Sequence, residues 1–380
     1  MSSTVRILNV THVLPDHAAA AGSPQRLPDD GVVKLSFMDS LFIDRVPMQR
    51  LFFYEGPDVP PFPAVARSLR SSLAAVVLGV AVHHAVADGY SVWQFMSAWS
   101  SVSRSACSAA AAELPLPAPA FDRAAIRYPG ADDVARRVLH AIAPALPVAR
   151  PPSLFTPLDQ RRRSFVLRAG NIQAVKQRMV AQSAAIGDGE HQSARPSTFL
   201  AVSALVWTSV ARAKSLDLDP AADAHFLVPV DLRRRLRSPP GERYFGNCVV
   251  PCFAVAAAGD LCDDGAGLAR AGAAIRGAVR ARLDGGDPLG GVAASLGAFA
   301  GVPKERFTVT GSSDRFMAYE TDFGWGAPSR VELVSLFTRE LVLLLGAGDG
   351  AVQVTAALGH AHMDGFAANL MRFSEQDHGA

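Results

Sequence analysis

This sequence has few cysteines, almost no net charge and no long apolar run. It contains four cysteines, Cys107, Cys248, Cys252 and Cys262. None of them has paired CxxC spacing, so neither a disulfide framework nor a cysteine-bound zinc ion is indicated, and a reducing compartment is expected. The net charge is only +2, and the short arginine clusters lack interleaved aromatic residues, so nucleic acid is not an expected partner.

Apolar segments of membrane-spanning length are absent as well. The longest one, Leu73 to Val82, is far shorter than the roughly 20 residues that cross a bilayer. The first residues carry no apolar segment typical of a secretory signal, so we expect a cytoplasmic protein that does not bind a membrane. A Gly-x-Ser-x-Gly elbow is also missing, so hydrolysis by a serine triad is not indicated.

The chain does have an ordinary globular composition. Of its 380 residues, 49% are hydrophobic and 19% are charged, which is enough for two domains that each bury a core. Apolar patterns predict strands at 5–13, 32–37, 48–54, 76–82, 164–167, 226–230, 248–255, 306–310, 331–337, 341–345 and 351–357. They predict helices at 63–73, 92–102, 132–142, 171–182, 197–214, 263–279 and 363–373. Strands and helices in both halves predict an α/β (α+β) fold with mixed sheets.

The segment His84-Ala85-Val86-Ala87-Asp88-Gly89 follows the apolar run that ends at Val82, and it is expected to place a histidine in a turn. Imidazole has an ordinary pKa near 6.5, so it can take a proton from a hydroxyl group and return it, which is worth about 10²- to 10⁴-fold in rate. His-x3-Asp spacing also recurs by chance. Taken alone, it favours an ordinary buried histidine over a catalytic one.

A second histidine pair, His360 and His362, invites a metal interpretation, because His-x-His on a strand would put two imidazoles on one face. Asp364 is expected to cap the last helix, and the sequence offers no third ligand. No metal site is therefore predicted.

Several further motifs accompany the histidine turn. They are Asp322-Phe323-Gly324-Trp325-Gly326, Tyr244-Phe245-Gly246-Asn247-Cys248, Asp231-Leu232-Arg233, Leu35-Ser36-Phe37 with Asp39, Phe121-Asp122-Arg123, Ser197-Thr198-Phe199 with Trp207, and Met363-Asp364. Together with His84 to Gly89 they resemble the BAHD acyltransferases, plant enzymes that move an acyl group from coenzyme A to a hydroxyl or amine. The resemblance covers nearly the whole chain, and its two main motifs, HxxxDG and DFGWG, are highly specific in this order.

The resemblance implies two domains arranged as in chloramphenicol acetyltransferase. Residues 1–150 and about 307–335 would form an N-terminal domain that carries HxxxDG, and residues 160–306 and about 336–380 a C-terminal domain. Residues 144–159 would cross between them. The family likeness further implies a monomer without a permanently bound cofactor, which uses acyl-CoA as a co-substrate.

His84 is the general base that the resemblance implies, and it would act without an acyl-enzyme by deprotonating an acceptor hydroxyl that attacks the thioester. The indole N–H of Trp325 is a candidate donor to the oxyanion, with loop packing as an equal alternative. Asp88 would pair with Arg233 and fix the histidine turn, which Gly89 permits. Support of the Trp325 loop is assigned to Asp322, Gly324 and Gly326.

The pentapeptide Tyr244 to Cys248 resembles the clade that acylates phenolic and flavonoid glucosides, most often with malonyl groups. A malonyl donor carries a free carboxylate, which an arginine at 161–163 could bind, although a solvated basic edge is the alternative. Arg234, Arg235 and Arg237 could instead bind the phosphates of coenzyme A. The candidate donor-binding residues are Arg162, Arg163, Ser197, Thr198, Arg234, Arg235, Tyr244, Gly246 and Asn247.

The chain departs from the family near residue 75. The predicted helix at 63–73 runs into the strand at 76–82 without a loop signal, where family members have several more strands. We therefore expect an internal deletion that removes strands from the N-terminal domain, and the loss of sheet partners would threaten stability. The alternative to an active enzyme is a shortened, non-catalytic chain that binds coenzyme A or a partner, or does not fold alone.

Overall fold

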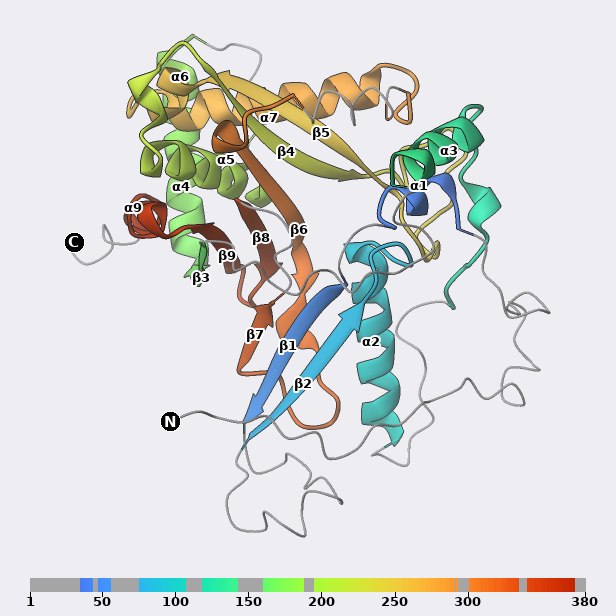
Figure 1. Cartoon of the computed structure of the whole chain (residues 1–380). Helices are drawn as coiled ribbons and strands as arrows, with labels where there is room; N and C mark the ends of the chain where they lie inside the picture. The colour runs from blue at the N-terminus through green and yellow to red at the C-terminus, as the bar shows by residue number, and fades with distance from the viewer. Residues whose placement is uncertain are drawn as a thin grey trace. The chain divides into compact units, whose positions relative to one another are not determined.

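The computed structural model describes residues 35–43, 47–55, 75–106, 118–142, 160–187, 195–290, 292, 301–334 and 340–372. Its strands are β1 (Met48–Glu55), β2 (Ala75–Val82), β3 (Gln160–Leu167), β4 (Asp223–Asp231), β5 (Val249–Ala257), β6 (Phe307–Met317), β7 (Arg330–Leu333), β8 (Leu341–Gly346) and β9 (Val352–Gly359). Its helices are α1 (Phe37–Ser40), α2 (Gly89–Ala106), α3 (Ala131–Ile142), α4 (Ala169–Ala185), α5 (Thr198–Ala213), α6 (Ala258–Cys262), α7 (Gly267–Asp284) and α9 (His360–Met371). The predicted mixed α/β fold is confirmed (Figure 1).

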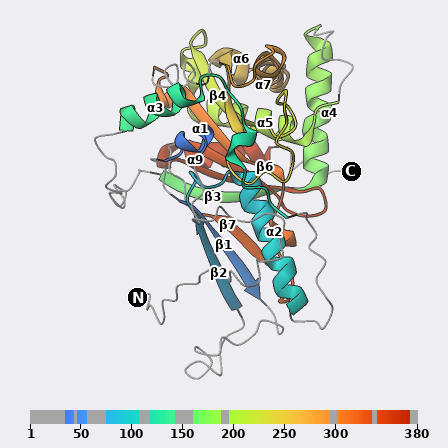
Figure 2. The ribbon, with the colours of Figure 1, turned by 90° about the vertical axis from the view of Figure 1, so that its right-hand side faces the viewer.

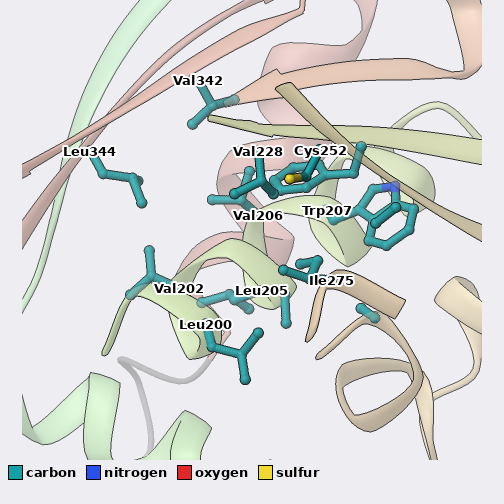
Figure 3. Packing of buried hydrophobic residues seen from close by; sticks show 14 of the residues in the cluster. Leu200, Val202, Leu205, Val206, Trp207, Val228, Cys252, Ile275, Val342 and Leu344 are labelled. Carbon is teal, nitrogen blue, oxygen red and sulfur yellow. The ribbon is translucent and has the colours of Figure 1, made fainter. Parts of the chain in front are cut away.

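The larger sheet has six strands in the order β3-β9-β8-β6-β4-β5. β6 pairs in parallel with β4 and β8, whereas the other pairs are antiparallel. Helix α5 packs against α7 and α9, and its residues 200–211 are all buried, so this helix is enclosed around its whole circumference. Figure 3 shows Trp207 of α5 near Cys252 and Ile275, and its ring stacks on Phe226 at 5.3 Å.

The smaller sheet has three described strands in the order β2-β1-β7, all antiparallel. Alternate residues of β1 are buried, which brings Met48, Arg50, Phe52 and Tyr54 to one face, as the two-residue period of a strand requires. The Phe52 ring lies 6.1 Å from Trp93 of α2, so this helix packs on that face (Figure 2). The face that contacts α2 therefore carries a buried arginine among aromatic residues.

Three local predictions are wrong. Phe37 begins α1 instead of ending a strand, because Ser36 caps this helix and exchanges hydrogen bonds with Asp39 in a capping box. His360 and His362 lie in α9 and not on a strand, so their side chains point in different directions at 3.6 residues per turn. Asp364 lies inside that helix, whose N-cap is Gly359.

Several predictions concern residues outside the described ones. The strand at 5–13, the helix at 63–73 and the crossover at 144–159 fall there, so the domain boundaries and the deletion stay predictions. β2 pairs with β1 alone among the described strands. Within the part of the chain that the structure describes, no helix has the length and apolar character needed to cross a membrane.

Candidate active site

His84 lies in the turn that joins β2 to α2. The turn is closed by the Val86 N–H, which donates to the His83 carbonyl at 3.0 Å. The His83 ring belongs to the turn itself, because its Nδ1 accepts from the Ala85 N–H at 3.1 Å. The partly buried His84 ring is instead held by residues from two other parts of the chain.

A phenyl ring and an amide hold the His84 imidazole. The Phe42 ring stacks on it with a centroid distance of 4.0 Å and an interplanar angle of 6°. On its edge, His84 Nδ1 lies 3.2 Å from Oδ1 of Asn247, a residue of the Tyr244 to Cys248 motif. A lone phenylalanine in a loop carries no local signal of this role, so Phe42 cannot be found from the sequence alone.

The orientation of the Asn247 amide determines which imidazole nitrogen carries the proton. Its Nδ2 donates to the His84 carbonyl at 2.8 Å and to Asp39 Oδ1 at 2.8 Å. Both of those partners are acceptors, so the NH₂ group must face them and Oδ1 must face His84. His84 Nδ1 is therefore the donor, and Nε2 keeps its lone pair.

The electrostatic environment keeps this imidazole neutral. Burial lowers the pKa of His84 from 6.5, and the positive charge of Arg50 lowers it further, against raising effects from Asp88 and Asn247. At neutral pH the unprotonated form dominates. A neutral ring with a free Nε2 is the form that a general base requires.

Asp39 fixes the amide in turn and is fully buried. Its Oδ1 accepts from Asn247 N at 3.1 Å in addition to Nδ2, and its Oδ2 accepts from Ser36 Oγ at 2.8 Å. Arg123 Nε lies 3.1 Å from the same Oδ2. The sequence links the motifs that contain Ser36, Asp39 and Arg123 only through the family likeness, and the fold is what brings these residues together beside Asn247.

Asp88 and Arg233 form the predicted ion pair. Both side chains are 1% exposed, and two guanidinium nitrogens each donate to a carboxylate oxygen at 2.9 Å. Arg233 also donates to the carbonyls of Tyr244 and Gly246, so the pair joins the histidine turn to the Tyr244 to Cys248 segment. This geometry agrees with a structural role for Asp88, since its carboxylate is used by Arg233 and by the N–H groups of Ser91 and Cys248.

The reason proposed for Gly89 needs correction. Gly89 does not adopt a positive φ, so the turn itself does not demand glycine. A Cβ atom there would lie 2.9 Å from the Phe316 ring, so it is close packing that favours glycine at this position.

The loop from Asp322 to Gly326 is built around one carboxylate oxygen. Asp322 Oδ1 accepts from the N–H groups of Gly324, Trp325 and Gly326 at 2.8, 3.0 and 2.9 Å, and both glycines have positive φ, 95° and 85°. The Trp325 ring packs on Tyr54 at 5.4 Å and on Phe323 at 5.5 Å. None of the contacts described for Trp325 joins it to His84, so its role at an oxyanion stays a prediction.

The nine candidate donor-binding residues separate into two groups in space. Tyr244, Gly246 and Asn247 lie beside the histidine turn, where Tyr244 is fully buried and its ring faces the guanidinium groups of Arg123 and Arg233 at 5.5 and 5.7 Å. These contacts give the Tyr244 motif a packing role at the site.

Five of the other six candidates have partners of their own. Arg163 pairs with Asp364 at 3.3 Å, and the pKa of Arg162, beside it on β3, is lowered by burial. Ser197 caps α5, and Thr198 accepts from Lys176 at 3.0 Å. Arg234 pairs with Glu242, and Arg235 donates to the Asp231 carbonyl at 3.3 Å. No described contact joins these six to the histidine, and donor binding by them stays a prediction.

Metal binding is not part of this geometry. Among the described residues, no three His, Cys, Asp or Glu side chains cluster in a way that could hold a metal ion.

Comparison with known proteins gives the class of the chain. A family model described as the Transferase family matches residues 75–372, so the chain belongs to this family. BAHD acyltransferase DCR of Arabidopsis thaliana is 30% identical over 83% of this chain. The malonyl-coenzyme:anthocyanin 5-O-glucoside-6'''-O-malonyltransferase of Salvia splendens is 28% identical over 69% of it. The resemblance to BAHD acyltransferases, predicted from the motifs, is confirmed.

The chain spans only part of these relatives, 60% of the length of DCR and 53% of that of the Salvia enzyme. Its fold is nevertheless similar to a solved structure over almost its whole length. The crystal structure of vinorine synthase superposes with a TM-score of 0.67 and 18% identity, covering 93% of this chain and 95% of that one. This likeness confirms the predicted fold.

Proposed function

We propose that the protein is an acyl-CoA-dependent O-acyltransferase that transfers a malonyl group to a hydroxyl of a phenolic or flavonoid glucoside. The observation that supports it most is the tautomer of His84. Because Asn247 accepts the Nδ1 proton, the neutral ring presents Nε2 as its only base. Family membership supplies the reaction class in which such a base would act.

The proposed reaction has two proton transfers at one nitrogen. His84 Nε2 takes the proton of the acceptor hydroxyl as its oxygen attacks the thioester carbonyl, giving a tetrahedral oxyanion and an imidazolium ion. When the oxyanion collapses, the C–S bond breaks and the imidazolium returns its proton to the leaving thiolate of coenzyme A. Burial lowers the pKa of His84, which makes the imidazolium a stronger acid for this second step.

The malonyl donor and the glucoside acceptor rest on similarity. The Salvia relative is named for both groups, and the Tyr244 to Cys248 segment resembles the same clade. We therefore take malonyl-CoA and a glucosylated phenol as the first substrates to test. The proposed enzyme is a cytoplasmic monomer.

A non-catalytic chain is the second candidate. The chain spans little more than half of its relatives' length, and Val77 on β2, which pairs with β1 alone among the described strands, is 49% exposed. Apolar side chains on an edge strand favour association with another chain. Absence of a cooperative melt by circular dichroism, or a folded protein without activity, would favour this candidate.

The test is acyl transfer from malonyl-CoA to a panel of flavonoid and phenolic glucosides, with product detected by mass spectrometry. We expect His84→Ala to lower kcat/KM by about 10²-fold or more, in a protein that still melts cooperatively. His140→Ala is the matched control, because His140 is exposed on α3. Equal rates for His84→Ala and the unmodified protein would exclude His84 as the base.

A further inference from the structure

Arg50 is a buried arginine for which the described part of the chain provides no acidic partner. It lies on the face of β1 that contacts α2, and 6% of its surface is exposed. Its guanidinium carbon lies 5.4 Å from the centre of the Trp93 ring, and Nη2 makes a weak contact with the Met48 sulfur at 4.0 Å. Nε has no hydrogen-bond partner, and no carboxylate in the described part of the chain pairs with this group.

The other buried arginines around the site are neutralised. Arg233 pairs with Asp88 at 2.9 Å, and Arg123 lies 3.1 Å from Asp39. Burying an unpaired guanidinium is far more costly than burying one that has a carboxylate partner. Burial lowers the pKa of Arg50 to about 10, so the side chain is still charged at neutral pH.

Trp93 adds a second unused donor at the same place. It is 7% exposed, and its Nε1 also lacks a hydrogen-bond partner. The face of its ring contacts the Arg50 guanidinium, which leaves the N–H edge of the guanidinium for another ligand. A carboxylate has two oxygens that accept several hydrogen bonds and could satisfy both side chains.

This pair of donors lies on two elements next to the turn of the candidate base. On β1, Arg50 is paired with Val80 of β2, four residues before His84. Trp93 is in the second turn of α2, which begins directly after the histidine turn. The charge of Arg50 reaches His84, whose pKa it lowers.

We propose that Arg50, with Trp93 beside it, binds the free carboxylate of a dicarboxylic acyl group such as malonyl and so selects the acyl donor. This inference rests on the proposed acyl transfer. In malonyl-CoA the carboxylate is one carbon away from the thioester carbonyl, so both must lie near the base during transfer. The phosphates of coenzyme A are separated from the thioester by the pantetheine arm, which makes them unsuitable ligands for a group beside His84.

The experiment compares malonyl-CoA with acetyl-CoA, which lacks the carboxylate, using one neutral glucoside acceptor. We expect Arg50→Gln to lower kcat/KM for malonyl-CoA by about 10- to 100-fold, the loss typical of a charge-assisted hydrogen bond, and to leave acetyl-CoA within about threefold. Arg50→Lys should recover part of the loss. Arg330→Gln is the matched control, since Arg330 also faces an aromatic ring, that of Phe53, but is 66% exposed and paired with Glu332.

A titration separates this inference from the proposed function. Isothermal titration of malonyl-CoA and acetyl-CoA into His84→Ala protein, with and without Arg50→Gln, reports donor selection without turnover. Malonyl-CoA should bind more tightly than acetyl-CoA to the His84→Ala protein that keeps Arg50. This difference in affinity should vanish when Arg50→Gln is added. If the unmodified protein transfers neither acyl group, the proposed function fails, while this titration still decides the role of Arg50.

Three results would overturn the role of Arg50. They are an equal loss for both donors, a loss that appears only with an acidic acceptor, and no loss at all. Arg50→Met adds a structural readout. Removing an unpaired buried charge should raise the melting temperature of the ligand-free protein, whereas a marked fall would show that Arg50 serves packing.

Discussion

The hydrogen bond between Asn247 and His84 is the feature whose removal tests the site most directly. Asn247 is fully buried, and its side chain has three partners, His84 Nδ1 at 3.2 Å, the His84 carbonyl at 2.8 Å and Asp39 at 2.8 Å. Asn247→Ala removes all three and leaves Asp39 with fewer donors. The imidazole can then take the tautomer that carries its proton on Nε2. In that tautomer Nε2 has no free lone pair and cannot accept the proton of the acceptor hydroxyl.

The expected loss follows from two known magnitudes. A wrong tautomer in a serine-protease triad lowers kcat by about 10⁴-fold, whereas losing a supporting hydrogen bond at a metal site costs about 10- to 100-fold. Asn247 is neutral and its bond to His84 is of ordinary length, so we expect an intermediate loss in kcat of about 10²- to 10³-fold, equivalent to about 3–4 kcal/mol.

The pH profile of kcat/KM gives the sign of the effect. As the proposed base, His84 would act only when unprotonated, so activity should fall as the pH falls through its pKa. Burial should place this limb of the profile below pH 6.5. Asn247 raises the pKa of His84, so Asn247→Ala should move the limb to lower pH. Asn247→Asp places a negative charge at Nδ1 and should move it to higher pH, while repelling Asp39.

These experiments can refute the argument in a simple way. If Asn247→Ala retains activity within about threefold and both variants keep the unmodified pH profile, Asn247 does not set the tautomer. A lower melting temperature with unchanged kcat per folded molecule would assign Asn247 to folding alone. Circular dichroism melts of the same preparations distinguish these cases.

Two other predictions concern the supports of the site. Asp88→Asn should destabilise the protein by about 3–5 kcal/mol, because it leaves the buried Arg233 charge without its carboxylate. Urea unfolding measures this loss of stability, and a change below about 1 kcal/mol would contradict the importance of the pair. Trp325→Phe should keep kcat within a few-fold and lower the melting temperature, because Trp325 contacts Tyr54 and Phe323. A loss in kcat of about 10²- to 10³-fold at unchanged stability would instead identify its indole N–H as an oxyanion donor.

The sequence by itself determined the class of the fold and singled out His84 as the candidate base. Period-2 and period-3.6 apolar patterns located most strands and helices, such as β4 and α5, because these patterns depend on neighbours along the chain. The HxxxDG and DFGWG motifs identified the family. Each motif forms a local turn or loop that needs particular residues, so it can be recognised from a short stretch of sequence. The His84 turn and the Asp322 loop are of this kind, since their hydrogen bonds join residues a few positions apart.

Only the tertiary structure decided how the base is set. Asn247 is far from His84 in sequence, and Phe42 and Asp39 approach from a third segment, so no local pattern reveals that they meet. The same holds for Arg50, which the sequence shows as one arginine in an apolar strand. Its lack of a partner is a property of all the side chains packed around it, and burial makes that lack energetically significant.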